Sequence, residues 1–200
     1  MADARSTAPA VGATTPGHYG VAGAQVALGT RRIAYAWNAQ GDPRDAKFNA
    51  ATQTTLGLTL PTRPNTMTHD VSRTALWLGP RSWLILAYAE GVPTSAGYQV
   101  ARGAINAAGG ALFDVSASRI AFTLHGPRAA DVLAKSCPLD FHPRVFAPGQ
   151  CAQSLLGHMN VLIAKVDGTP TFTVLVARSL APDAWRSLCL NAAPLGYDVS

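Results

Sequence analysis

Hydrophobic and polar positions alternate along several stretches of this chain, and this pattern predicts β-strands. Between Val21 and Asn38, small apolar residues alternate with polar ones, and Ile33, Tyr35 and Trp37 fall on one side of an extended segment. Further strands are predicted where short runs of apolar residues end at turn residues. These strands cover residues 74–78, 82–88, 119–124, 162–166 and 172–176.

Two of the predicted strand pairs are joined by residues typical of tight turns. Gly79-Pro80 separates the strands at 74–78 and 82–88, which predicts a hairpin. The stretch Asp167-Gly168-Thr169-Pro170 separates 162–166 from 172–176 and predicts a second hairpin.

Helix start and stop residues predict four helices. Asp45 suits an N-cap and Gly57 a helix end, so a helix is predicted from Asp45 to about Leu56. The others cover 95–108, stopped by two glycines, 127–135, with proline in its first turn, and 181–190. Prolines at positions 138, 143 and 148 exclude regular structure from the fifteen residues after the third helix.

The arrangement of these elements predicts one α+β domain. Ala, Thr, Pro and Gly dominate the start of the chain and offer little to bury, so residues 1–20 are predicted to be a flexible tail. Residues 21–200 are predicted to form a single domain, because 48% of the 200 residues are hydrophobic and suffice for a sizeable core.

Two segments of the chain resemble each other. Asp70 to Arg81 and Asp114 to Arg128 share an Asp-Val-Ser start, an apolar strand and a Gly-Pro-Arg end. The shared pattern suggests the duplication of a mixed α/β unit.

Charge favours a protein partner over nucleic acid. The formal net charge is +5, but basic residues are scattered, and Arg31-Arg32 is the only basic pair. Only 14% of the residues are charged, which is few for an isolated surface. We therefore expect burial against a partner with an acidic surface rather than nucleic-acid binding.

Cysteine usage and the absence of targeting patterns predict a cytoplasmic protein. Cys137, Cys151 and Cys189 are an odd number, and a chain of this size has no need of disulfides. No signal-like segment and no long apolar run is present, so neither export nor a membrane location is expected.

Residues capable of chemistry gather in one region without forming a recognisable site. Cys137, His142, Cys151 and His158 could be imagined as zinc ligands or as a cysteine nucleophile with its base, but their spacing lacks the close pairs of such sites. The alternative is that the cysteines are buried and the histidines structural. Neither a GxGxxG nor a GxxxxGK[ST] loop occurs, so the chain is not expected to bind NAD or FAD.

The sequence resembles the gamma subunits of heterotetrameric sarcosine oxidases over roughly residues 70–190. The resemblance is carried by LGPRSWL at 78–84, DVS at 114–116, GPRAADVLAK at 126–135, CPLDFHPR at 137–144, PGQCAQ at 148–153 and VARS at 176–179. It implies an α+β fold of two intertwined ferredoxin-like halves with antiparallel sheets, as in the folate-binding domain of glycine-cleavage aminomethyltransferases.

The resemblance also implies a non-catalytic structural role in an enzyme that oxidises sarcosine to glycine. The products would be hydrogen peroxide and 5,10-methylenetetrahydrofolate or formaldehyde. The partners would be the alpha, beta and delta subunits: NAD and tetrahydrofolate in alpha, FAD in beta, FMN between them and zinc in delta. No cofactor or metal is expected in this chain.

Two further expectations complete the picture. A free-standing folate-binding aminomethyltransferase is the alternative, although Gly168-Thr169-Pro170 stands where that family carries a Gly-Glu pair. The segment from Cys137 to Cys151 is the leading candidate for a subunit contact. The interface candidates are Arg128, Cys137, Asp140, His142, Arg144, Gln150 and Arg178.

Overall fold

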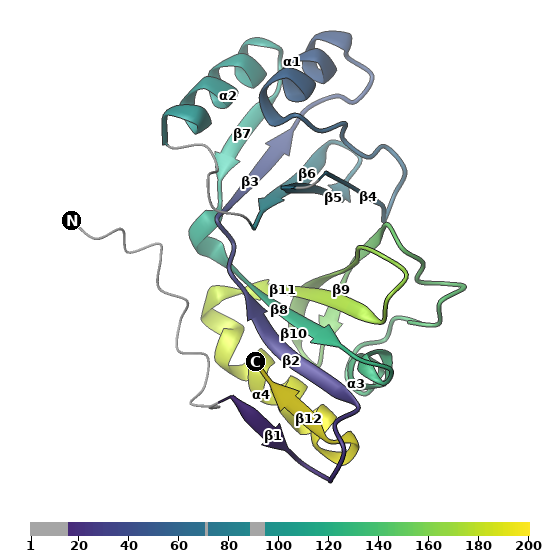
Figure 1. Cartoon of the computed structure of the whole chain (residues 1–200). Coiled ribbons are helices and arrows are strands. Elements are labelled where there is room, and N and C mark those ends of the chain that lie inside the picture. Colours follow the sequence, from purple (N-terminus) through teal and green to yellow (C-terminus); the bar gives the residue numbers. More distant parts are fainter. Residues whose placement is uncertain (1–15, 71, 89–94) are drawn as a thin grey trace, which may run out of the picture. The chain divides into compact units, whose positions relative to one another are not determined.

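The computed structural model describes residues 16–70, 72–88 and 95–200. Within these residues the chain forms an α+β fold with four α-helices and two β-sheets (Figure 1). It divides into two compact units, each with its own hydrophobic core. The inserted unit comprises residues 33–117, and the terminal unit comprises the described residues up to Arg32 and those from Ser118 onward.

The inserted unit is built on the small sheet, an antiparallel sheet with the strand order β4-β5-β6-β3-β7. Helices α1 and α2 lie side by side in this unit (Figure 1). Its elements are β3 (Tyr35–Gln40), α1 (Ala46–Leu56), β4 (Met67–His69), β5 (Arg73–Gly79), β6 (Ser82–Ala87), α2 (Ser95–Ala107) and β7 (Ala111–Asp114). The predicted hairpin around Gly79-Pro80 is confirmed.

The predicted capping of α1 is also confirmed. The Asp45 carboxylate accepts hydrogen bonds from the backbone N–H groups of Lys47 at 2.7 Å and Phe48 at 3.4 Å. At the other end Gly57 adopts φ 69° and donates its N–H to the Gln53 carbonyl at 3.0 Å. Both ends of this helix therefore satisfy groups that the helix itself cannot pair.

Phe48 of α1 is packed where two glycines leave room for its ring. The ring centroid lies 5.9 Å from that of the fully buried Trp83, whose indole N–H donates to the Pro61 carbonyl at 2.7 Å. A Cβ atom at Gly41 or Gly110 would stand 2.3 or 2.6 Å from the Phe48 ring. Glycine is needed at both positions to leave space for this ring, not to permit an unusual φ.

The terminal unit is built on the large sheet, with the strand order β1-β12-β2-β8-β11-β10-β9. Only β12 and β2 are parallel among its described strand pairs. The elements are β1 (Gly17–Tyr19), β2 (Val26–Arg31), β8 (Arg119–His125), α3 (Ala129–Ala134), β9 (Gln150–Leu156), β10 (Met159–Lys165), β11 (Thr171–Ala177), α4 (Ala181–Ala192) and β12 (Tyr197–Val199). The hairpin predicted at Asp167–Pro170 is the β10–β11 connection.

Three sequence predictions differ from the structure. The single strand expected over 21–38 is wrong: it is two strands, because Val26 and Leu28 of β2 join one core and Tyr35 and Trp37 of β3 join the other. No strand was predicted between the proline-rich stretch and residue 162, yet β9 occupies residues 150–156. Most of the expected tail, residues 1–15, lies outside the described residues, whereas 17–19 form strand β1.

The two units repeat one strand order, but not in the alignment that the sequence suggests. In the small sheet β5-β6-β3-β7 are adjacent, and in the large sheet the corresponding order is β10-β11-β8-β12 with β2 inserted before β12. The resemblance in sequence instead pairs β5 with β8, which occupy different places. It reflects a shared turn, since Asp70 and Asp114 each accept a hydrogen bond from the backbone N–H two residues on, at 2.7 and 2.9 Å.

Strand β1 is held to β12 by a histidine whose two ring nitrogens both face hydrogen-bond acceptors. Nδ1 of His18 lies 2.9 Å from Oδ1 of Asp198, and Nε2 lies 2.9 Å from the Val21 carbonyl oxygen. Both neighbours only accept hydrogen bonds, so both ring nitrogens must donate, which only the imidazolium form can do. The Asp198 hydrogen bond, followed by that of Val21, raises the pKa of His18 above its ordinary value.

We predict that pairing of β1 with β12 weakens as pH rises. A raised pKa in the folded state means that the stabilisation is complete below the unfolded value of about 6.5 and is lost as pH rises through the raised value. Hydrogen exchange of the Tyr19 amide, corrected for intrinsic rate, should show less protection at about pH 8 than at about pH 5. Asp198→Asn should reduce this difference, and equal protection at both pH values in the unmodified chain would contradict the prediction.

Candidate functional site

Most of the predicted contact residues lie in the connection between α3 and β9, which we call the α3–β9 loop (residues 135–149). It contains no α-helix or β-strand and forms the green trace between these two elements in Figure 1. Three of the seven interface candidates, Asp140, His142 and Arg144, are exposed on it.

Two aromatic side chains anchor the loop to the core of the terminal unit. Phe141 and Phe146 are 4% and 6% exposed, and their ring centroids are 5.5 Å apart. Phe172 of β11 lies below them, with its centroid 5.5 Å from Phe141 and 6.2 Å from Phe146. Edge-to-face rings at these distances fix the loop at two points on the sheet.

Hydrogen bonds satisfy much of the loop's backbone. The Asp140 carboxylate accepts from the N–H of His142 at 2.8 Å, and the His142 carbonyl accepts from Val145 and Phe146 at 2.8 and 2.9 Å. The Gln150 side-chain oxygen accepts from the N–H of Ala147 at 2.5 Å. A loop tied in this way loses little further entropy when another protein binds it.

The outward side of the loop combines apolar and basic groups. His142, Pro143 and Arg144 are exposed, and the neighbouring Val145 is 55% exposed although it is hydrophobic. An exposed apolar side chain beside an arginine on a rigid support is typical of a protein contact surface.

Lys165 was not singled out by the sequence, yet it lies under the same loop. It is 5% exposed, its carbonyl accepts from the N–H of Gly149 at 2.8 Å, and its Nζ lies 5.5 Å from the Phe172 ring centroid. The signal in the sequence that could have marked this residue is a lysine at the end of an otherwise largely apolar strand. Cation–π contact compensates part of the cost of burying this amine.

The other interface candidates do not join this exposed surface. Arg128 begins α3 and forms an ion pair with Asp131 through Nε, one helical turn away. Cys137 is buried in the core, with its sulfur 3.5 Å from the Ser154 hydroxyl oxygen. Arg178 lies at the opposite end of β11 from Thr171, in a short 3₁₀ turn (Arg178–Leu180).

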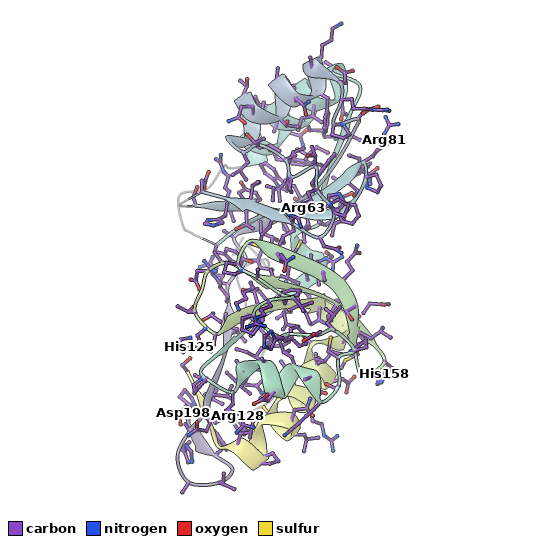
Figure 2. All side chains as sticks on the ribbon, turned by 90° about the vertical axis from the view of Figure 1, so that its right-hand side faces the viewer. Arg63, Arg81, His125, Arg128, His158 and Asp198 are labelled. Atoms are coloured by element: carbon purple, nitrogen blue, oxygen red, sulfur yellow. The ribbon has the colours of Figure 1, made fainter. Side chains whose placement is uncertain are left out.

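The four residues considered as zinc ligands are not gathered. Cys137 belongs to the core on the helix-covered face of the large sheet, as does Ala152, whereas strand alternation puts Cys151 on the other face. His158 is exposed in the β9–β10 turn, at one edge of the unit and far from His125 in Figure 2. No group of three or more potential metal ligands occurs among the described residues.

Cys137 and Cys189 also lack the features of an activated nucleophile. The hydrogen bond given by Cys137 goes to a serine, and burial raises the pKa of the Cys189 thiol, which a hydrogen bond with Tyr197 only partly offsets. A raised pKa leaves little of the reactive thiolate near neutral pH.

The carboxylate of the β10–β11 turn, Asp167, is engaged in the turn's own structure. The Asp167 carboxylate accepts from the hydroxyl of Thr169 and from its N–H at 2.9 Å. These two bonds are the main reason that the pKa of Asp167 is lowered, with smaller contributions from the charges of His125 and Lys165. This carboxylate is therefore committed to the turn.

Helices long and apolar enough to cross a membrane are absent from the part of the chain that the structure describes. In the inserted unit Arg63 and Arg81 lie apart from each other (Figure 2), whereas Arg44 and Arg81 both approach Oδ2 of Asp42, at 3.1 and 3.8 Å.

Comparison with known sequences points to one family. Residues 40–194 match the profile of the sarcosine oxidase, gamma subunit family. The sarcosine oxidase subunit gamma of Corynebacterium sp. (strain U-96) is 40% identical over 116 residues, which are 58% of this chain and 55% of that protein. The corresponding Arthrobacter sp. subunit is 39% identical over 116 residues, with the same shares. The match thus spans about half the length of these relatives.

Comparison with solved structures agrees. The heterotetrameric sarcosine oxidase from Corynebacterium sp. U-96, in complex with pyrrole 2-carboxylate, contains a chain that superposes with a TM-score of 0.75 at 29% identity, covering 88% of each chain. The glycine cleavage system aminomethyltransferase T from Bartonella henselae gives a TM-score of 0.62 at 14% identity, covering 88% of this chain and 48% of that one. The second likeness concerns the fold alone.

Proposed function

Because this chain belongs to the sarcosine oxidase gamma subunit family, we propose that it is a non-catalytic, structural subunit of a heterotetrameric sarcosine oxidase. The α3–β9 loop supports this role best. It is anchored by Phe141 and Phe146, tied by its own hydrogen bonds, and presents Arg144 and Val145 outward. Such a preorganised surface costs little to bind and suits a permanent contact.

The activity in this proposal belongs to the assembled complex. The complex would oxidise sarcosine to glycine in the cytoplasm, releasing hydrogen peroxide and 5,10-methylenetetrahydrofolate or formaldehyde. The alpha, beta and delta subunits would carry NAD, tetrahydrofolate, FAD, FMN and zinc. The described residues of this chain contribute packing surface, since its turn carboxylate Asp167 and its cysteines are engaged in its own fold.

We infer further that the two units correspond to a pair of ferredoxin-like halves. The strand order within each sheet supports this, because each unit runs strand, helix, three strands, helix and strand. The first of the three strands lies at the edge of its sheet, and the strand that opens the series lies inside the sheet. The insertion of β2 into the large sheet, ahead of the inserted unit in the sequence, would make the halves intertwined.

Co-expression with the other sarcosine oxidase subunits of the same organism tests the proposed role. Purification through a tag on this chain should recover a yellow complex that oxidises sarcosine, whereas the chain alone should be colourless and inactive. Val145→Asp should weaken recovery of the partners roughly tenfold, because it places a charge in an apolar contact.

A matched control separates loss of contact from a general effect of added charge. Val100→Asp makes the same change at a valine that is 68% exposed on α2 of the inserted unit, and it should leave recovery unchanged. Flavin bound to the isolated chain, or full recovery with Val145→Asp, would count against the proposal.

A free-standing folate-binding protein is the second candidate, favoured by the fold shared with aminomethyltransferase T. Titration of the isolated chain with tetrahydrofolate distinguishes it. Binding in the micromolar range would support this candidate, and the engagement of Asp167 in its turn leads us to expect none.

A further inference from the structure

Arginines that are scattered in the sequence meet at one end of the large sheet. Arg31 ends β2 and Arg32 follows it, Arg119 begins β8, and Arg178 directly follows β11. Strands β2, β8 and β11 are neighbours and run antiparallel (Figure 1), so the end of β2, the start of β8 and the end of β11 coincide. We call these four residues the arginine cluster.

The strand register places two of these arginines on the same face. Arg31 lies opposite Ala121, and Arg119 stands two residues before Ala121 on the same strand. Side chains two residues apart on a strand share a face, so Arg31 and Arg119 are diagonal neighbours with Cβ atoms roughly 7–8 Å apart. Ile120, between them in sequence, points instead into the core. Two guanidinium groups on one face of a sheet create a positive potential that favours an anionic group beside them.

Arg119 is the member whose charge is least compensated. Its side chain is partly buried, and no hydrogen bond or ion pair joins it to another of the described residues. Burial lowers the pKa of its guanidinium, and no carboxylate in the described part of the chain offsets this effect. By contrast with Arg119, Arg128 is paired with Asp131 and Arg44 with Asp42.

We propose that the arginine cluster is a docking site for a carboxylate-bearing segment of a partner subunit, with Arg119 as its central contact. A guanidinium can bind a carboxylate through two parallel hydrogen bonds, and it is less strongly hydrated than an ammonium group. Partial burial strengthens such a pair and keeps it from being screened by salt. The arginine cluster lies at the end of β11, whereas the α3–β9 loop packs on Phe172 near the start of that strand. The inference rests on the proposed function for the identity of the partner.

Charge reversal in the co-expressed complex tests the cluster. Arg119→Glu should reduce recovery of the partner subunits at least about tenfold, because truncating or reversing one member of a buried charge pair leaves the other unpaired. Arg186→Glu, which makes the same change at an exposed position of α4 in the same unit, should leave recovery unchanged. Arg119→Met retains the aliphatic stem and should also reduce recovery, which keeps the test decisive where Arg119→Glu fails to fold.

Chemical cross-linking identifies the partner group directly. Arg119→Lys introduces an amine that a carbodiimide joins to a carboxylate in contact with it, and mass spectrometry should find this lysine linked to an Asp or Glu of another subunit. Arg186→Lys should give no such link.

The possible failures are distinguishable. If the unmodified chain recovers no sarcosine oxidase subunit, the proposed function itself is wrong. If it recovers them and Arg119→Glu and Arg119→Met do so equally well, the docking inference is overturned. Nucleic acid that co-purifies with the unmodified chain and is lost with Arg119→Glu, while subunit recovery is unchanged, would assign the cluster to nucleic acid instead.

Discussion

Phe172→Ala should lower the free energy of unfolding by about 3–5 kcal/mol, since this substitution removes a fully buried ring from a packed core. Phe172 is 1% exposed and supports three neighbours: Phe141, Phe146 and the amine of Lys165. Removing the Phe172 ring takes away both its own packing in the core and its contacts with Phe141 and Phe146. Urea unfolding followed by tryptophan fluorescence measures the change.

The same substitution should impair assembly more than its effect on stability alone explains. Without Phe172 the α3–β9 loop loses the surface on which Phe141 and Phe146 rest, so its exposed residues are no longer held in one arrangement. Phe172→Leu fills most of the volume and should cost less than about 1.5 kcal/mol. Phe113→Ala, at a ring that is 49% exposed on β7, should change stability by less than about 0.5 kcal/mol. If Phe172→Ala lowers the free energy of unfolding no more than Phe113→Ala does, the Phe172 ring does not anchor the α3–β9 loop.

Gly110→Ala should destabilise the inserted unit by about 1–3 kcal/mol, because the added methyl group has no space. Its Cβ would lie 2.6 Å from Cε2 of Phe48 and 2.8 Å from the carbonyl oxygen of Gln40, and the second of these is backbone that cannot rotate away. Thermal unfolding monitored by circular dichroism should show a lowered midpoint.

Two comparisons identify the cause of that loss. Gly103, within α2, has nothing within 4 Å of the corresponding Cβ position, so Gly103→Ala should raise stability by about 0.5–1 kcal/mol through helix propensity. Combining Gly110→Ala with Phe48→Leu should cost less than the sum of the two single changes, because the smaller side chain relieves the clash. If the two single changes add in the double variant, the loss of stability in Gly110→Ala does not come from a clash with Phe48.

Local signals in the sequence predicted most elements of the fold correctly. Asp45 and Gly57 marked both ends of α1, and Gly79-Pro80 and Asp167–Pro170 marked two hairpins, because caps and tight turns depend on only a few neighbouring residues. Strand β9 and the short strands β1, β4, β7 and β12 escaped prediction. Each short strand has three or four residues, too few for a hydrophobic period, and is defined by the strand beside it.

The candidate site was predicted in part. The rare residue combinations of the α3–β9 loop indicated the family and a candidate contact loop, but they did not distinguish the outward Arg144 from the buried Cys137. Lys165 was passed over because the sequence pattern of a strand does not show that the α3–β9 loop, through Gly149, lies against that end of the strand. The direction in which an irregular loop's side chains point depends on what they pack against, not on a repeating period.

The sequence by itself therefore determined the class of fold, the ends of its main helices and hairpins, and the family to which the chain belongs, because each depends on residues close together in the chain. Only the tertiary structure decided that the stretch from Val21 to Asn38 divides between two cores, and that Arg31, Arg119 and Arg178 lie together. These arginines are far apart in sequence and appeared scattered. They meet because antiparallel pairing of β2, β8 and β11 brings the end of one strand beside the start of the next, and no local pattern records that pairing.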